Sequence, residues 1–146
     1  MSTVQDILKE KGTTVHRVSP KATVLEATRE MNNHRIGALI VSEGDRLVGM
    51  FTERDVLSRV VAEERLPSKV SVREVMTVEV ACCTPKTTIE EARSVMKHRR
   101  IRHLPVVDDS SGELLGMISI GDLNGYHIDG QETTIHLLNE YLYGRV

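Results

Sequence analysis

Gly116-Met117-Ile118-Ser119-Ile120-Gly121-Asp122-Leu123 is the stretch that decides the fold, because an earlier segment of the chain repeats its pattern. The earlier segment is Gly49-Met50-Phe51-Thr52-Glu53-Arg54-Asp55-Val56. In both, a glycine opens a short apolar run, and a hydroxyl residue is followed three positions later by an aspartate. The pattern is typical of a strand that ends in a turn and continues as a helix. The simplest interpretation of either copy alone is an N-terminal helix cap, in which hydroxyl and carboxylate each accept a backbone N–H.

The repetition extends well beyond this turn. Residues 65 positions apart match along most of the chain, as with Thr23 and Thr88, which each begin a Thr-x-x-Glu capping box. An apolar stripe at helical spacing follows each box, and then a strand-like run, Ile36 to Val41 in one copy and Ile101 to Val107 in the other. An internal repeat of this length indicates a duplicated supersecondary unit. We therefore predict an α+β fold in which a β-α-β-β-α unit occurs twice.

The repeats also set the expected domain boundaries. The predicted parts are a short helix at 3–11, a first repeat at 12–62, a linker at 63–76 containing the start of a short helix, a second repeat at 77–127 and a C-terminal helix at 128–146. The C-terminal helix has an apolar face that needs cover. Leu138 and Leu142 on this face are expected to contact a second subunit or the edge of the module.

Composition excludes several classes of function. The 146 residues include 19 basic and 21 acidic side chains, so a general nucleic-acid binder is not expected. No long apolar run is present, so we expect a cytoplasmic protein with no membrane contact. Cys82 and Cys83, the only cysteines, are adjacent, which suits neither a structural disulfide nor a metal site. If they lie on a strand, one should be buried and the other turned away, and a redox role stays open.

Two such units in tandem, each ending in Gly-apolar-apolar-[Ser/Thr]-x-x-Asp, resemble the paired cystathionine β-synthase (CBS) domain, or Bateman module. The most similar stretches are Ile101 to Asp108 and Thr52-x-Arg54-Asp55. The resemblance implies two repeats packed sheet against sheet around a pseudo-twofold axis, with clefts between them and a homodimeric assembly. It also implies a stand-alone regulatory module, not an enzyme, that changes shape and reports to an unidentified regulated protein.

The resemblance further implies an adenine nucleotide as ligand, with AMP favoured and ADP, ATP, NAD or S-adenosylmethionine as alternatives. The residues that would contact ribose and phosphate, with both carboxylates at exposed turns, are Asp122, Ser119, Asp55, Thr52, Arg102, His103 and Arg54. The residues that would contact the base are Val15, His16, Val41, Met50, Val80, Ala81, Val106 and Met117. No metal, catalytic residue or catalytic cofactor is expected.

The two clefts are not expected to be equivalent. The second repeat has Arg102 and His103 where the first has Gly37 and Ala38, and a small uncharged pair cannot neutralise a phosphate. Arg54 could supply the missing charge. Arginines near the shared centre favour a phosphorylated ligand over a bare nucleoside.

Two other classes of function remain as alternatives. An enzyme is disfavoured because no HExxH, CxxC, GxSxG or P-loop pattern is present. Nucleic-acid binding through the cationic run Lys97 to His103 is disfavoured because the run contains no aromatic residue.

Overall fold

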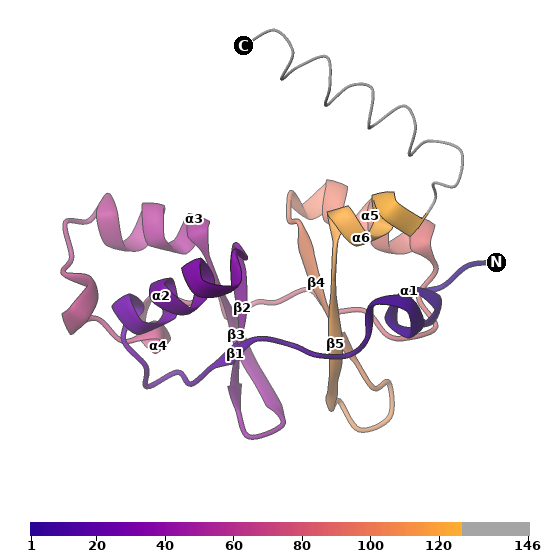
Figure 1. Cartoon of the computed structure of the whole chain (residues 1–146), viewed down its shortest axis with the longest axis horizontal. Coiled ribbons are helices and arrows are strands. Elements are labelled where there is room, and N and C mark those ends of the chain that lie inside the picture. The colour runs from indigo at the N-terminus through magenta and orange to yellow at the C-terminus, as the bar shows by residue number, and fades with distance from the viewer. Residues whose placement is uncertain (127–146) are drawn as a thin grey trace, which may run out of the picture.

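The computed structural model describes residues 1–126, and its elements follow the predicted repeat (Figure 1). In chain order these are α1 (Val4–Lys11), β1 (Arg17–Val18), α2 (Val24–His34), β2 (Ala38–Glu43), β3 (Arg46–Thr52), α3 (Glu53–Asp55), the π-helical η1 (Val56–Val61), the 3-10 turn η2 (Pro67–Lys69), α4 (Val72–Val75), α5 (Ile89–Arg99), β4 (His103–Val107), β5 (Leu114–Ser119) and α6 (Ile120–Tyr126). The expected C-terminal helix, with Leu138 and Leu142, lies outside the described residues. No helix within residues 1–126 is long and apolar enough to cross a membrane.

Matching caps give the main helix of each repeat the same limits. Thr23 accepts the amide of Glu26 at the start of α2, and Thr88 accepts the amide of Glu91 at the start of α5. Both helices stop at an arginine in the left-handed region, with φ of 54° at Arg35 and 55° at Arg100. The capping boxes predicted from the sequence therefore do begin the two helices.

Each repeat contributes one sheet, and the two sheets stand next to each other in the middle of the molecule with helices at both flanks (Figure 1). The first sheet has the order β1-β2-β3, with β1 parallel to β2 and β3 antiparallel to it; the second pairs β4 and β5 antiparallel. Apolar side chains fill the space between the sheets: Ala38, Ile40, Met50 and Leu114, with Val15, Leu47, Val80 and Met117 packed against them. The predicted α+β class and sheet-to-sheet packing are confirmed.

The strand expected at the start of the second repeat is shortened to one bridge, between Cys83 and Val106. The preceding residues are committed elsewhere, because Thr77 exchanges two backbone hydrogen bonds of 2.8 and 2.9 Å with Met50 at the edge of β3. The chain therefore crosses from one sheet to the other within a few residues. Cys83 is buried and Cys82 exposed, as the strand alternation predicted.

The short helices α1 and α4 each pack against the repeat that they do not directly precede. α1 precedes the first repeat, yet Val4, Ile7 and Leu8 are buried in the core of the second. α4 precedes the second repeat, yet Val72 and Val75 are buried in the core of the first. Figure 1 shows both helices on the far repeat. Each core is thus completed by a segment that lies before the other repeat in the chain, which interlocks the two halves.

Candidate functional site

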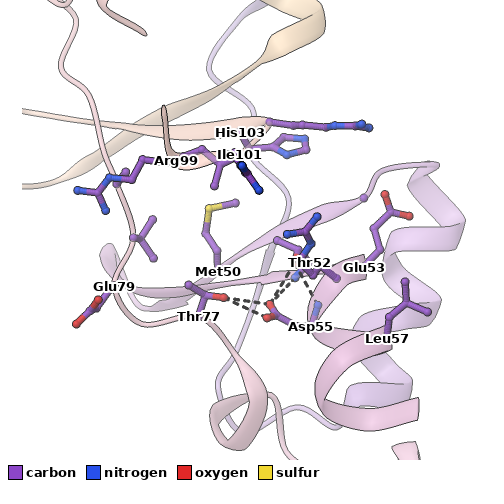
Figure 2. Close-up of a pocket in the computed structure, with 16 residues that line it drawn as sticks. Met50, Thr52, Glu53, Asp55, Leu57, Thr77, Glu79, Arg99, Ile101 and His103 are labelled. Carbon is purple, nitrogen blue, oxygen red and sulfur yellow. Dashed lines mark hydrogen bonds between the residues drawn. The ribbon is translucent and has the colours of Figure 1, made fainter. Parts of the chain in front are cut away.

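A cleft of about 580 Å³ opens between the repeats where the turn after β3 meets the start of β4 (Figure 2). Its lining comes from three parts of the chain: Gly37, Met50, Thr52–Asp55 and Leu57 of the first repeat, Thr77 and Glu79–Ala81 of the crossover, and Arg99–His103 of the second repeat. The structure therefore brings together Met50, Thr52, Arg54, Asp55, Val80, Ala81, Arg102 and His103 from the predicted site.

Asp55 is held at the base of this cleft. Its Oδ2 accepts the Thr52 amide at 3.0 Å, and the Asp55 amide donates to the Thr52 hydroxyl at 3.4 Å, which is the geometry of a helix cap. The Thr77 hydroxyl donates to Oδ1 at 3.1 Å. The prediction of an exposed turn is wrong for Asp55, which is only 4% exposed because the segment containing Thr77 covers it. Each carboxylate oxygen has two acceptor positions, so Oδ1 can accept a further hydrogen bond.

Asp122 has the same local geometry but a different partner. The Ser119 amide donates to Oδ2 at 2.8 Å, and the Asp122 amide donates to the Ser119 hydroxyl at 3.1 Å. The Lys11 ammonium also donates to Oδ2, at 2.7 Å, and to the carbonyl of Met117 at 2.9 Å. Sequence reasoning missed Lys11, which lies 111 positions from Asp122 and in a helix assigned no role.

The apolar part of the cleft is formed by Met50, Val80, Ala81 and Ile101. Figure 2 shows the Met50 side chain pointing from β3 toward Ile101 across the cleft. Other predicted base contacts lie elsewhere. Val15 and Met117 pack between the sheets, and the His16 ring stacks on His34 with 3.9 Å between centroids.

Two predicted base contacts are wrong. Val41 and Val106 are fully buried in the cores of their own repeats, packed with Met31 and Met96 of the flanking helices. Successive strand residues point to opposite faces, so Ile40, the neighbour of Val41, faces the opposite sheet instead.

Four arginines line the cleft. Arg54, Arg99, Arg100 and Arg102 are exposed, and within residues 1–126 none of the four forms an ion pair with a carboxylate. Glu53 and Glu79 also line the cleft, so the four positive charges exceed the negative ones even when Asp55 is included. A partly apolar cavity with an excess of positive charge favours an anionic ligand with a flat apolar group.

His103 adds a titratable group to this cavity. Burial is the larger cause that lowers the pKa of its imidazole, and the nearby Lys11 ammonium is the next. Asp122 and Glu53 act in the opposite direction. His103 is therefore held toward its neutral form.

The turns after β3 and β5 have equivalent backbone hydrogen bonds but different side chains. The Glu53 amide donates to the carbonyl of Gly37 at 3.0 Å, and the Ile120 amide donates to the carbonyl of Arg102 at 2.9 Å. Glycine at position 37 leaves room for the Glu53 carboxylate, which lies where a β-carbon would be. The second turn has a guanidinium and an isoleucine in these places, so the two turns differ in charge and in the space beside the backbone.

Cysteine and metal chemistry find little support in the described part of the chain. Burial, with a smaller effect of Cys82, raises the pKa of the Cys83 thiol to about 12, so it stays protonated near neutral pH. No group of three or more His, Cys, Asp or Glu side chains within residues 1–126 is placed to hold a metal ion.

Comparison with known proteins agrees with the geometry. The CBS domain family model matches twice, at residues 4–62 and 72–128. The CBS domain-containing protein YhcV of Bacillus subtilis is 38% identical over 123 residues, covering 84% of each chain. The mitochondrial CBS domain-containing protein CBSX3 of Arabidopsis thaliana is 32% identical over 98% of this chain and 73% of its own. A CBS-domain containing protein from Agrobacterium tumefaciens has a solved structure with a TM-score of 0.80, at 34% identity over 87% of this chain and all of the other. The chain therefore belongs to the CBS domain family, as a tandem pair of CBS motifs.

Proposed function

We propose that this CBS pair is a regulatory module that binds an adenine nucleotide, AMP in preference to the others, in the cleft between its repeats. The observation that carries the proposal is the composition of that single cavity. It combines a carboxylate in a strand-to-helix turn, an apolar slot and four arginines without ion-pair partners among residues 1–126. Its volume of about 580 Å³ is typical of a small-molecule site.

Each part of a nucleotide has a matching surface in the cleft. The base would lie between Met50 and the Val80–Ala81 wall, where apolar contact is available. One ribose hydroxyl would donate to Asp55 Oδ1, which within residues 1–126 accepts a hydrogen bond from the Thr77 hydroxyl alone and has one acceptor position left. The other oxygen, Oδ2, already accepts the Thr52 amide of the cap, so the carboxylate would hold the ribose mainly through Oδ1.

The cations define the third surface. Arg102 reaches the cleft from the second repeat and Arg54 from the first, so a phosphate between them would contact both halves of the chain. Guanidinium groups bind phosphate oxygens through paired hydrogen bonds. A ligand that bridges the repeats in this way would stabilise one arrangement of the two repeats over others. Such a shift in conformation is how a binding module can report to another protein.

One solved relative makes AMP the first ligand to test. The CBS domain protein PAE2072 from Pyrobaculum aerophilum, 24% identical with a TM-score of 0.71, has a structure in complex with AMP. At this identity the likeness supports the fold alone, so the proposal for this chain rests on its own cleft.

The test is thermal unfolding with a ligand panel of AMP, ADP, ATP, NAD, S-adenosylmethionine and adenosine. A ligand that binds only the folded state raises the midpoint in proportion to the logarithm of its concentration above its Kd. We expect AMP to raise the midpoint more than adenosine does. If no member of the panel shifts it, the proposal is abandoned.

Arg102→Ala separates phosphate recognition from base recognition. Charge-assisted hydrogen bonds contribute roughly 1.5–3 kcal/mol, so the variant should lose about ten- to a hundredfold in AMP affinity and little in adenosine affinity. Arg29→Ala is the matched control, because Arg29 is exposed on α2 and outside the cleft. Equal weakening of both ligands would remove the phosphate role, and salt-dependent oligonucleotide binding without an AMP effect would favour the nucleic-acid alternative.

A further inference from the structure

We propose that Lys11 is an intramolecular occupant of the second carboxylate turn, so that the chain accepts a nucleotide at the Asp55 turn and not at the Asp122 turn. This inference rests on the proposed function for the first cleft and adds a specificity-determining residue from α1. It explains why two turns with the same backbone would differ in what they bind.

The ammonium of Lys11 occupies two acceptors of the second turn. It donates to Asp122 Oδ2 at 2.7 Å and to the Met117 carbonyl at 2.9 Å. The same Oδ2 accepts the Ser119 amide at 2.8 Å. The carboxylate charge is neutralised by a group of the chain itself, and its second donor contact fixes the ammonium against the end of β5.

The cation at the first turn is farther from its carboxylate: Arg59 Nε lies 3.9 Å from Asp55 Oδ1, and its hydrogen bonds go to the carbonyls of Val75 and Met76 at 3.1 and 2.9 Å. The Asp55 carboxylate is paired with the Thr77 hydroxyl, a neutral group that can rotate and accept as well as donate. The Met50 carbonyl, the equivalent of the Met117 carbonyl, accepts the backbone amide of Thr77 at 2.8 Å. Lys11 thus does with a side chain what Thr77 does with its backbone. A single substitution can remove the Lys11 contact, which is made by a side chain, but not the Thr77 contact, which is made by the backbone.

The rest of α1 holds Lys11 in this position. Ile7 and Leu8 are buried against the second repeat, which anchors the helix one turn before Lys11. The pair itself lies at the mouth of the turn, since the Lys11 and Asp122 side chains are 36% and 24% exposed. Removing the ammonium should therefore open the turn without unfolding the core.

Calorimetric titration with AMP tests the proposal. We expect one AMP per chain for the wild type and two for Lys11→Met, which keeps an apolar side chain but has no charge. The double variant Lys11→Met with Asp122→Asn should return to one. Lys9→Met, on the exposed side of the same helix, is the control and should stay at one. Two sites in the wild type, or one site in Lys11→Met, would overturn the proposal.

A second measurement uses no nucleotide. When all lysines compete for a limiting amount of acetic anhydride, mass spectrometry gives the relative rate at each. Lys11 should react several-fold more slowly than the exposed Lys9 and Lys97, and Asp122→Asn should bring the Lys11 rate up to theirs. Equal rates in the wild type would overturn the Lys11 contact whether or not AMP binds. Absence of AMP binding by the wild type together with a slow Lys11 would contradict the proposed function and leave the contact established.

Discussion

His103 stands at the start of β4, where the two repeats meet, and its surroundings disfavour a positive charge. Burial and the Lys11 ammonium, in that order, hold the pKa of His103 below its ordinary value. A bound phosphate would act in the opposite direction, because an anion stabilises the imidazolium. Phosphate binding and proton uptake at His103 are therefore expected to be linked.

The lowered pKa of His103 also predicts how the unfolding free energy depends on pH. In the unfolded chain His103 regains a pKa near 6.5, so below this pH the unfolded state binds more protons than the folded state. The contribution of His103 to stability is present above pH 6.5 and is lost as the pH falls through the lower folded-state pKa. We expect His103→Gln to reduce the fall in unfolding free energy between pH 7.5 and 5.5, measured in urea. His98→Gln is the control, because His98 is exposed on α5. An unchanged pH dependence in His103→Gln would contradict the account.

At the scale of elements, the exchange of α1 and α4 between the repeats determines how the molecule holds together. Ile7 of α1 is 3% exposed and lies in the core of the second repeat. Val72 of α4 is fully buried in the core of the first. Neither repeat has a complete core without the segment that precedes the other, so the two are expected to unfold together.

Ile7→Ala tests this exchange. Truncation of a buried isoleucine removes apolar contacts and leaves a cavity, at a cost of about 2–5 kcal/mol in unfolding free energy. Hydrogen exchange should increase first in α5, β4 and β5 of the second repeat, although Ile7 precedes the first repeat in the chain. Glu10→Ala, at an exposed position of the same helix, should change stability by no more than about 0.5 kcal/mol. Faster exchange confined to the first repeat would contradict the exchange of helices.

The elements themselves could be predicted from the sequence, because their causes are local. The capping boxes at Thr23 and Thr88 begin the helices as predicted, and the repeat at a spacing of 65 residues gives the order of elements except for the opening strand of the second repeat, which is a single bridge. The faces of the strands could not be predicted as well. A continuous apolar run has no alternation to show which side faces the cleft, so the sequence could not show that Val41 and Val106 point into the cores of their own repeats.

At the scale of the whole molecule, the sequence could not show which partners the two carboxylates have. Thr77 bonds to Asp55 and Lys11 bonds to Asp122 from segments that lie before the opposite repeats, and no spacing rule relates such residues. Three parts of the candidate cleft could be predicted from the sequence: its carboxylate, the wall formed by Val80 and Ala81, and its arginines. These residues belong to the repeated motif or lie next to it. The burial of Asp55 and the occupation of Asp122 follow only from the interlocked packing.

This packing makes the two halves similar in backbone and different in chemistry. The cleft at Asp55 is open, cationic and partly apolar, whereas the turn at Asp122 is paired with Lys11. A molecule of this kind would bind one nucleotide across two repeats. The ligand would then contact both repeats, and its binding energy would act on the whole interlocked unit.

The most direct test of the central claim is calorimetric titration of AMP into the wild type and into Asp55→Asn. Asparagine can keep the cap at Thr52 and a hydrogen bond to the Thr77 hydroxyl, so the fold should survive while the acceptor charge is lost. We predict saturable binding to the wild type and an affinity about ten- to a hundredfold lower for the variant, since hydrogen bonds to a charged acceptor contribute roughly 1.5–3 kcal/mol. No binding to the wild type, or equal affinity in a folded Asp55→Asn, would contradict the claim that this cleft binds a nucleotide through Asp55.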